Sequence, residues 1–232
     1  MDLSNVISTT ENLLYQLTVW LVLLPRTLFR VVTRPTWIPN YVAGELGKPN
    51  EQQFDEYMTP LLFFVLLTIV PNLIANTYWP QYPYTDFATD RNFVGQAQHL
   101  STQHRFFVYS LIWMLLPLSF AIVHLFAQKK ELSGSQLKPL FYSQCLRVAP
   151  LGLVFGLQFI TAKALGPGII HPFVLSSATV ALAAAWLLYS DIRISVRSFN
   201  VTPGRAVRLA LASVALYYLL IAPVILLSVL LR

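Results

Sequence analysis

The sequence predicts an all-α fold: a polytopic bundle of about five transmembrane helices, with an amphipathic helix lying in the membrane interface at its N-terminal side. The composition carries this prediction. Hydrophobic residues make up 56% of the 232 residues, and the mean hydropathy is +0.58. Only 11% of the residues are charged, against about 25% in an ordinary soluble domain. Because a soluble protein of this size could not bury so much apolar surface, we expect the bilayer to be its solvent.

Five apolar stretches are long enough to cross a bilayer, which takes about 20 mostly apolar residues. We expect spans at residues 59–78, 106–128, 140–163, 169–190 and 207–231. The chain therefore divides into a cytoplasmic leader, residues 1–57, and a five-helix transmembrane domain, residues 58–232.

The leader contains an apolar segment, residues 13–24, which is too short to span a membrane. Arginines then recur every fourth residue, at Arg26, Arg30 and Arg34, so they form one basic stripe on a helix. This pattern predicts a helix over residues 13–32 that lies flat in the cytoplasmic interface, with its arginines toward lipid phosphates. The alternative is a sixth span over residues 6–29.

Lysines and arginines alternate between the two sides of the predicted membrane. Twelve of the 16 fall in or beside the leader and the loops after the second and fourth spans, and four fall on the other side. By the positive-inside rule, the N-terminus is cytoplasmic and the C-terminus is outside. The net charge of +6 is then explained by topology and by anionic lipid headgroups, and nucleic acid is not an expected partner.

Polar residues inside spans are candidates for function, because they are expensive in hydrocarbon. Gln158 falls mid-span, where it either makes one hydrogen bond between helices or lines a polar path. Arg147 and His124 fall near span ends, where they are expected to snorkel toward water, as do Lys163 and His171. No predicted span contains an acidic residue near its middle, which argues against an ion-driven transporter.

Small residues recur at four-residue spacing and predict close helix packing. They are Gly152 and Gly156 in the third span, and Ser177, Ala181 and Ala185 in the fourth. Such positions pack either within the chain's own bundle or against a partner protein or a second copy.

No motif of a hydrolase, metalloprotease or nucleotide-binding enzyme occurs in a fitting context, so we expect no catalytic residues, no metal and no cofactor. The long outer loop carries Asp86, Asp90, His99 and His104. Their spacing matches no strong metal motif, and the simpler interpretation is that they are solvated. Cys145 is the one cysteine, so it forms no internal disulfide.

Three passages resemble the Yip1-like superfamily of five-span membrane proteins, including its bacterial permease-like members. The first is the Arg34-Pro35 leader that runs to Tyr57-Met58-Thr59-Pro60 and the first span. The others are Trp186-Leu187-Leu188-Tyr189 at the end of the fourth span, and the short turn before Gly204-Arg205-Ala206 and a terminal apolar helix. The resemblance implies a role in membrane trafficking, assembly or permeation, implies no catalytic residues, and points to a bacterial inner membrane.

These observations favour a non-enzymatic membrane protein that acts as a scaffold, an assembly or trafficking factor, or an accessory subunit of a membrane complex. Its expected partners are membrane lipids, including anionic headgroups, and a membrane protein or a second copy of the chain. The alternative is a small permease or channel subunit for a small solute or lipid, favoured by Gln158 and by a proline within each of four spans.

The topology can be tested with reporter fusions. A reporter that is active only in the cytoplasm should work when fused at Gly134 or Gly204 and fail at Ala88 or Gly166, because the basic loops stay inside. Activity of the fusion at Ala88 would overturn the five-span topology.

Overall fold

The computed structural model describes residues 3–78, 102–164 and 172–230, and helices joined by short connections make up these ranges. The order is α1 (Leu3–Thr33), η1 (Pro35–Trp37), α2 (Ile38–Leu46), η2 (Asn50–Gln52), α3 (Pro60–Tyr78), α5 (Thr102–Ala127), α6 (Gly134–Ala164), α7 (Pro172–Ser198) and α8 (Pro203–Leu230). The predicted all-α fold with an N-terminal helix is therefore confirmed.

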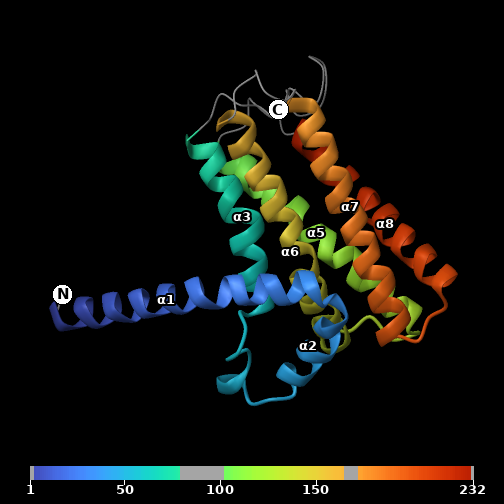
Figure 1. Ribbon diagram of the computed structural model, residues 1–232, viewed down its shortest axis with the longest axis horizontal. Helices are drawn as coiled ribbons and strands as arrows, with labels where there is room; N and C mark the ends of the chain where they lie inside the picture. Colours follow the sequence, from blue (N-terminus) through green and yellow to red (C-terminus); the bar gives the residue numbers. More distant parts are fainter. Residues whose placement is uncertain (1–2, 79–101, 165–171, 231–232) are drawn as a thin grey trace.

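The transmembrane part is a bundle of long helices that corresponds to the predicted spans (Figure 1). Four stretches are long and apolar enough to cross a bilayer: Phe107–Ala127, Gly134–Leu157, Ala178–Ser198 and Pro203–Val224. The described apolar part of α3, Pro60–Pro71, is shorter. The chain is therefore a multi-pass membrane protein. Helix α7 continues eight residues beyond the predicted end of its span at Ser190, and this difference matters for the site described below.

Helix α1 crosses the bundle at a large angle, near one end of α3 and α6 (Figure 1). It is longer than predicted, because it begins at Leu3 and continues through Pro25 to Thr33. Exposed apolar side chains on it include Leu21, Val22 and Phe29. These would lie against lipid in the flat orientation.

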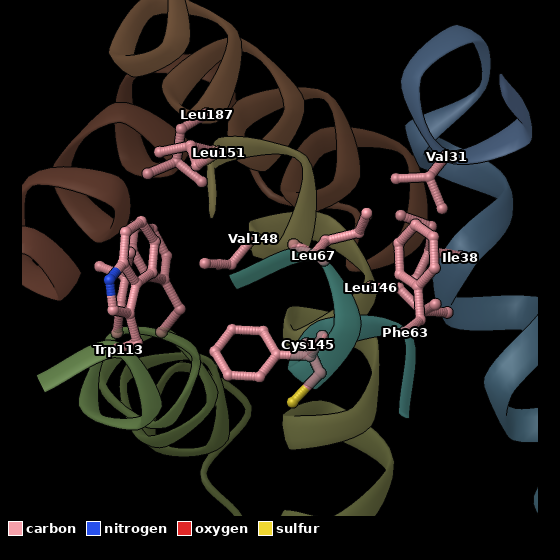
Figure 2. Packing of buried hydrophobic residues seen from close by; sticks show 14 of the residues in the cluster. Val31, Ile38, Phe63, Leu67, Trp113, Cys145, Leu146, Val148, Leu151 and Leu187 are labelled. Atoms are coloured by element: carbon pink, nitrogen blue, oxygen red, sulfur yellow. The ribbon is translucent and has the colours of Figure 1, made fainter. Parts of the chain in front are cut away.

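The leader shares one hydrophobic core with the bundle. Val31 of α1 and Ile38 and Val42 of α2 are fully buried and belong to the same cluster as Phe63 and Leu146 (Figure 2). The backbone N–H of Met58 also donates a hydrogen bond of 3.1 Å to the Thr27 hydroxyl, which ties the segment before α3 to α1. The position of α1 is therefore fixed by burial against the spans.

The closest helix packing joins α6 to α3. A Cβ atom added at Gly152 would lie 2.3 Å from Cγ2 of Thr68, and one added at Gly156 would lie 2.5 Å from Cβ of Pro71. Both distances are too short for real atoms, so the two glycines let α3 approach closer than any other residue type would allow. In a membrane such contact is a main source of helix association, because lipid is as apolar as the side chains.

The Gly152→Ala variant tests this contact. We expect it to lower the stability in detergent by about 1–3 kcal/mol, because the added methyl overpacks against the α3 backbone. A thermal unfolding curve followed by tryptophan fluorescence measures the change.

Gly134→Ala is the matched control, because a Cβ there meets nothing within 4 Å. Equal stability of the two variants would contradict the close approach of α3 and α6.

Candidate functional site

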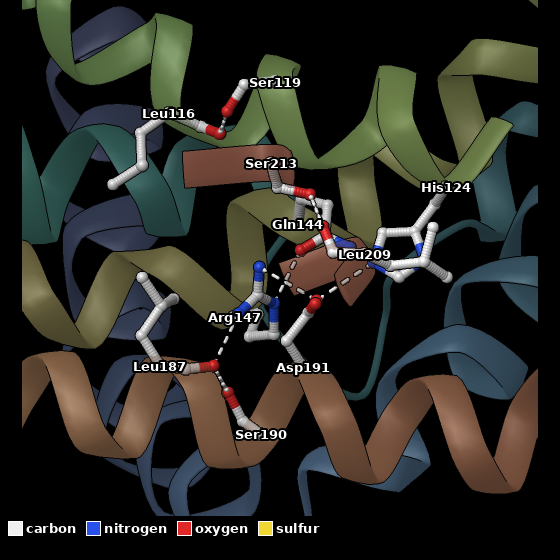
Figure 3. Close-up of polar contacts among 10 residues, drawn as sticks. All are labelled: Leu116, Ser119, His124, Gln144, Arg147, Leu187, Ser190, Asp191, Leu209 and Ser213. Carbon is white, nitrogen blue, oxygen red and sulfur yellow. Dashed lines mark hydrogen bonds and ion pairs between the residues drawn. The ribbon is translucent and has the colours of Figure 1, made fainter. Parts of the chain in front are cut away.

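Three helices bring ionisable side chains together in the interior of the bundle. Asp191 of α7 accepts a hydrogen bond from His124 Nε2 of α5, with 3.0 Å between Nε2 and Oδ1. The same oxygen lies 3.3 Å from Nη2 of Arg147 on α6. All three side chains are essentially fully buried, with at most 1% of the side chain exposed, and they point toward one another (Figure 3). We call these three residues and Gln144 the charge cluster.

The remaining donors of the Arg147 guanidinium are also directed at the protein. Nε donates to Oε1 of Gln144 at 2.6 Å, and Nη1 donates to the Leu187 carbonyl at 2.9 Å. The Phe120 ring lies under the guanidinium, with 4.2 Å from Cζ to the ring centre. Arg147 is therefore held by α5, α6 and α7 at once.

Opposite charge explains how the cluster tolerates burial. A single buried charge is costly, but an ion pair with further hydrogen bonds recovers much of that cost. With a neutral histidine, Arg147 and Asp191 sum to zero charge. Because a carboxylate can only accept, His124 must carry its proton on Nε2. The cluster therefore acts as a polar tie between three helices.

Not every polar atom of the cluster has a partner within the part of the chain that the structure describes. Nδ1 of His124, Oδ2 of Asp191 and Nη2 of Arg147 are buried without a hydrogen bond, although Nη2 forms the ion pair. The buried hydroxyl of Ser195, one turn along α7 from Asp191, has no hydrogen-bond partner either. Such atoms are rare in native interiors. A histidine, a carboxylate and a hydroxyl can bind a proton or a small polar molecule, so the site has chemical capacity beyond its structural role.

The charge cluster corrects three sequence-based expectations. Arg147 and His124 were expected to snorkel, but both are buried, because α6 begins at Gly134 and α7 extends to Ser198 and encloses them. The third is the predicted end of the fourth span at Ser190, since α7 continues to Ser198 and Asp191 lies buried within it, seven residues before its end.

One signal in the sequence pointed to Asp191. No other acidic residue follows Glu131, although this part of the chain carries several arginines. A lone carboxylate that directly follows an apolar run needs a cationic partner if the helix continues and buries it. Arg147 on the preceding helix is that partner.

The predicted packing residues have different positions. Gly152 and Gly156 lie against α3, as described above. Ala181 and Ala185 are exposed on α7. The side chains of Ser177 and Gln158 lie outside the described residues, as does the outer loop with Asp86, Asp90 and His99.

The predicted surface arginines lie against aromatic rings of the leader. The guanidinium of Arg26 lies 4.8 Å from the Tyr57 ring centre, and that of Arg30 lies 5.3 Å from the Trp37 ring centre. Trp37 in turn stacks on Tyr41 at 4.2 Å. Burial, and then the nearby Glu45 carboxylate, raise the pKa of the Tyr41 phenol, so it stays neutral beside the arginines. Arg34 is exposed.

Comparisons with protein-family models, with curated proteins and with solved structures give no match for this chain.

The Asp191→Asn variant tests the ion pair. It should cost about 3–5 kcal/mol of stability, because Arg147 is left as an unpaired buried charge. Arg147→Met should cost a similar amount. The double variant Arg147→Met/Asp191→Leu should cost clearly less than the sum, since no buried charge remains.

Thermal unfolding of the purified protein in one detergent measures all three variants. Glu131→Gln, at an exposed carboxylate, is the matched control and should change nothing. Additive costs in the double variant would show that the two charges do not interact.

Proposed function

We propose that this chain is a non-enzymatic membrane protein that acts by lateral contact: a scaffold, an assembly or trafficking factor, or an accessory subunit of a membrane complex. The observation that carries the proposal is the unequal burial of the spans. The chain buries 67% of the apolar stretch of α6, but only 33% of that of α7 and 17% of that of α8. The outer faces of α7 and α8 are thus left to lipid or to another protein.

The outer face of α7 is shaped for close approach. Ala181 and Ala185 are exposed one turn apart, and Leu182 beside them is 72% exposed. Two small residues at this spacing let another helix come near, and a large apolar neighbour then packs at its side. The partner is accordingly a transmembrane helix, either of another protein or of a second copy of this chain.

The charge cluster supports a non-catalytic role. Its side chains point at one another in the bundle interior, and the guanidinium donates two hydrogen bonds and forms an ion pair within the protein (Figure 3). Catalytic side chains instead have to reach a bound substrate. The resemblance to the Yip1-like superfamily supports the same role and a bacterial inner membrane as the location. The distribution of lysines and arginines supports an N-terminus in the cytoplasm and a C-terminus outside.

A second candidate function, a small permease, is favoured by one specific observation. Asp191 and His124 are ionisable residues inside membrane helices, and each has a buried atom without a partner in the described part of the chain. Such residues mark proton and substrate paths in transporters. If the chain is a permease, His124→Gln should abolish pH-dependent uptake into vesicles while the fold persists.

Lateral association is tested by the Ala181→Leu/Ala185→Leu variant. We expect it to lose its partner, or its self-association, because two leucines hold the incoming helix away. Its own stability should be unchanged, since both positions are exposed. In-membrane crosslinking followed by purification in mild detergent detects the partner, and thermal unfolding checks the fold.

The matched control is Ala212→Leu, which makes the same change at an exposed position of α8. Association that survives in both variants would remove the α7 face as the contact surface. A protein that remains monomeric and alone in the wild-type membrane would overturn the proposal.

A further inference from the structure

A basic pocket of about 410 Å³ lies where the chain leaving α1 meets the C-terminal part of α7. Its lining residues are Arg30, Val32, Thr33, Arg34, Pro35, Thr36, Trp37, Tyr189, Arg193 and Arg197. We call it the arginine pocket. It joins two segments that are far apart in the sequence, and η1 is the part of the leader that packs most closely on α7.

The charge of the arginine pocket is not neutralised by the protein. Four of its ten lining residues are arginines, and none is acidic. Among the described residues, no carboxylate forms an ion pair with any of the four. In addition, Nε of Arg30 is buried without a hydrogen-bond partner. Like charges that line one pocket repel one another, so an anion that binds between them stabilises the arrangement.

Helix ends account for only part of this charge. Arg30 lies in the last turn of α1 and Arg197 in the last turn of α7, where helix C-termini carry partial negative charge. Each end contributes about half an elementary charge. Two ends therefore offset about one of four guanidinium charges, and a surplus remains for a ligand.

The surface of α7 above the pocket indicates which kind of anion binds. Leu182, Tyr189 and Arg193 are all exposed, and spacings of seven and four residues place them on one face of the helix. Along this face, the residue nearer the middle of α7, Leu182, is apolar, and the residue nearer the end of α7, Arg193, is basic. A lipid has the same polarity, with acyl chains in the hydrocarbon and a phosphate at the interface.

We propose that the arginine pocket binds the phosphate headgroup of an anionic membrane lipid, whose acyl chain lies along Leu182 and Tyr189. The planar guanidinium groups donate paired N–H bonds to phosphate oxygens, a geometry that arginine provides and lysine does not. The leader and α7 are then joined through the lipid as well as through the protein core. This binding does not depend on lateral association, since it requires neither a partner nor a second copy.

The test uses the purified full-length protein in neutral detergent, titrated with phosphatidylglycerol or phosphatidylcholine and observed by native mass spectrometry. We expect the wild type to retain phosphatidylglycerol in preference to phosphatidylcholine. Arg193→Gln/Arg197→Gln should weaken the binding of phosphatidylglycerol by about 30-fold, as expected for the loss of two basic contacts. The affinity of Arg193→Lys/Arg197→Lys should lie between those of the wild type and the glutamine variant, because lysine keeps the charge but lacks the paired donors of the guanidinium.

Lys130→Gln/Arg208→Gln is the matched control. It removes the same charge from exposed positions that do not line the pocket, and it should leave lipid binding nearly unchanged. Equal weakening in the control, or equal retention of both lipids by the wild type, would overturn the proposal.

Inorganic phosphate and glycerol phosphate, added in large excess, separate the two sources of phosphate. We expect neither to displace the lipid. Complete displacement by either would overturn the lipid assignment in favour of a soluble phosphate ligand. Thermal unfolding confirms that the variants are folded, which is expected because Arg193 and Arg197 are exposed.

Discussion

The ion pair between Arg147 and Asp191 is the constraint on which the bundle depends. Two charges have been removed from both water and headgroups, and only each other, His124, Gln144 and a backbone carbonyl remain as partners. An apolar side chain tolerates a small shift of its helix, because it exchanges one apolar neighbour for another. A buried charge does not, since a displacement of one helical turn would leave it unpaired. The pair therefore fixes the register of α6 against α7, and the hydrogen bond from His124 to Asp191 fixes α5 against α7 in the same way.

The rest of the bundle is arranged around α6. One face carries Gly152 and Gly156, which bring α3 into backbone contact. Another carries Arg147 toward α7, and Cys145, Leu146 and Val148 between them fill the core (Figure 2). Because α6 packs against α3, α5 and α7, it is the most buried of the candidate spans, whereas α8 lies at the edge of the bundle. The exposed edge is what leaves a surface for lateral contact.

The sequence was sufficient to predict the long helices of the bundle but not α2 or the charge cluster. Runs of apolar residues locate α3, α5, α6, α7 and α8 to within several residues at each end, because the length needed to cross a bilayer is a local property. The pairing of Asp191 with Arg147 and His124 is not local, since these residues are separated by 44 and 67 positions. Hydropathy gives no information on which charges pair, and only the folded structure shows that Arg147 and Asp191 neutralise each other. The sequence does not predict the arginine pocket for the same reason. Its spacing places Arg30 and Arg34 on one stripe, but Arg193 and Arg197 come from a distant helix.

The end of α7 connects the interior of the protein to its surface. Asp191 and Ser195 are one turn apart and buried, while Arg193 and Arg197 are one turn apart and exposed on the opposite side. Alternate faces of a single helical segment thus form the internal ion pair and the external arginine pocket. Rotation of α7 that preserves one arrangement necessarily preserves the other, because the helix is rigid over these two turns. The internal pair consequently determines where Arg193 and Arg197 face the leader, and a ligand in the arginine pocket bears on the same segment that the ion pair holds.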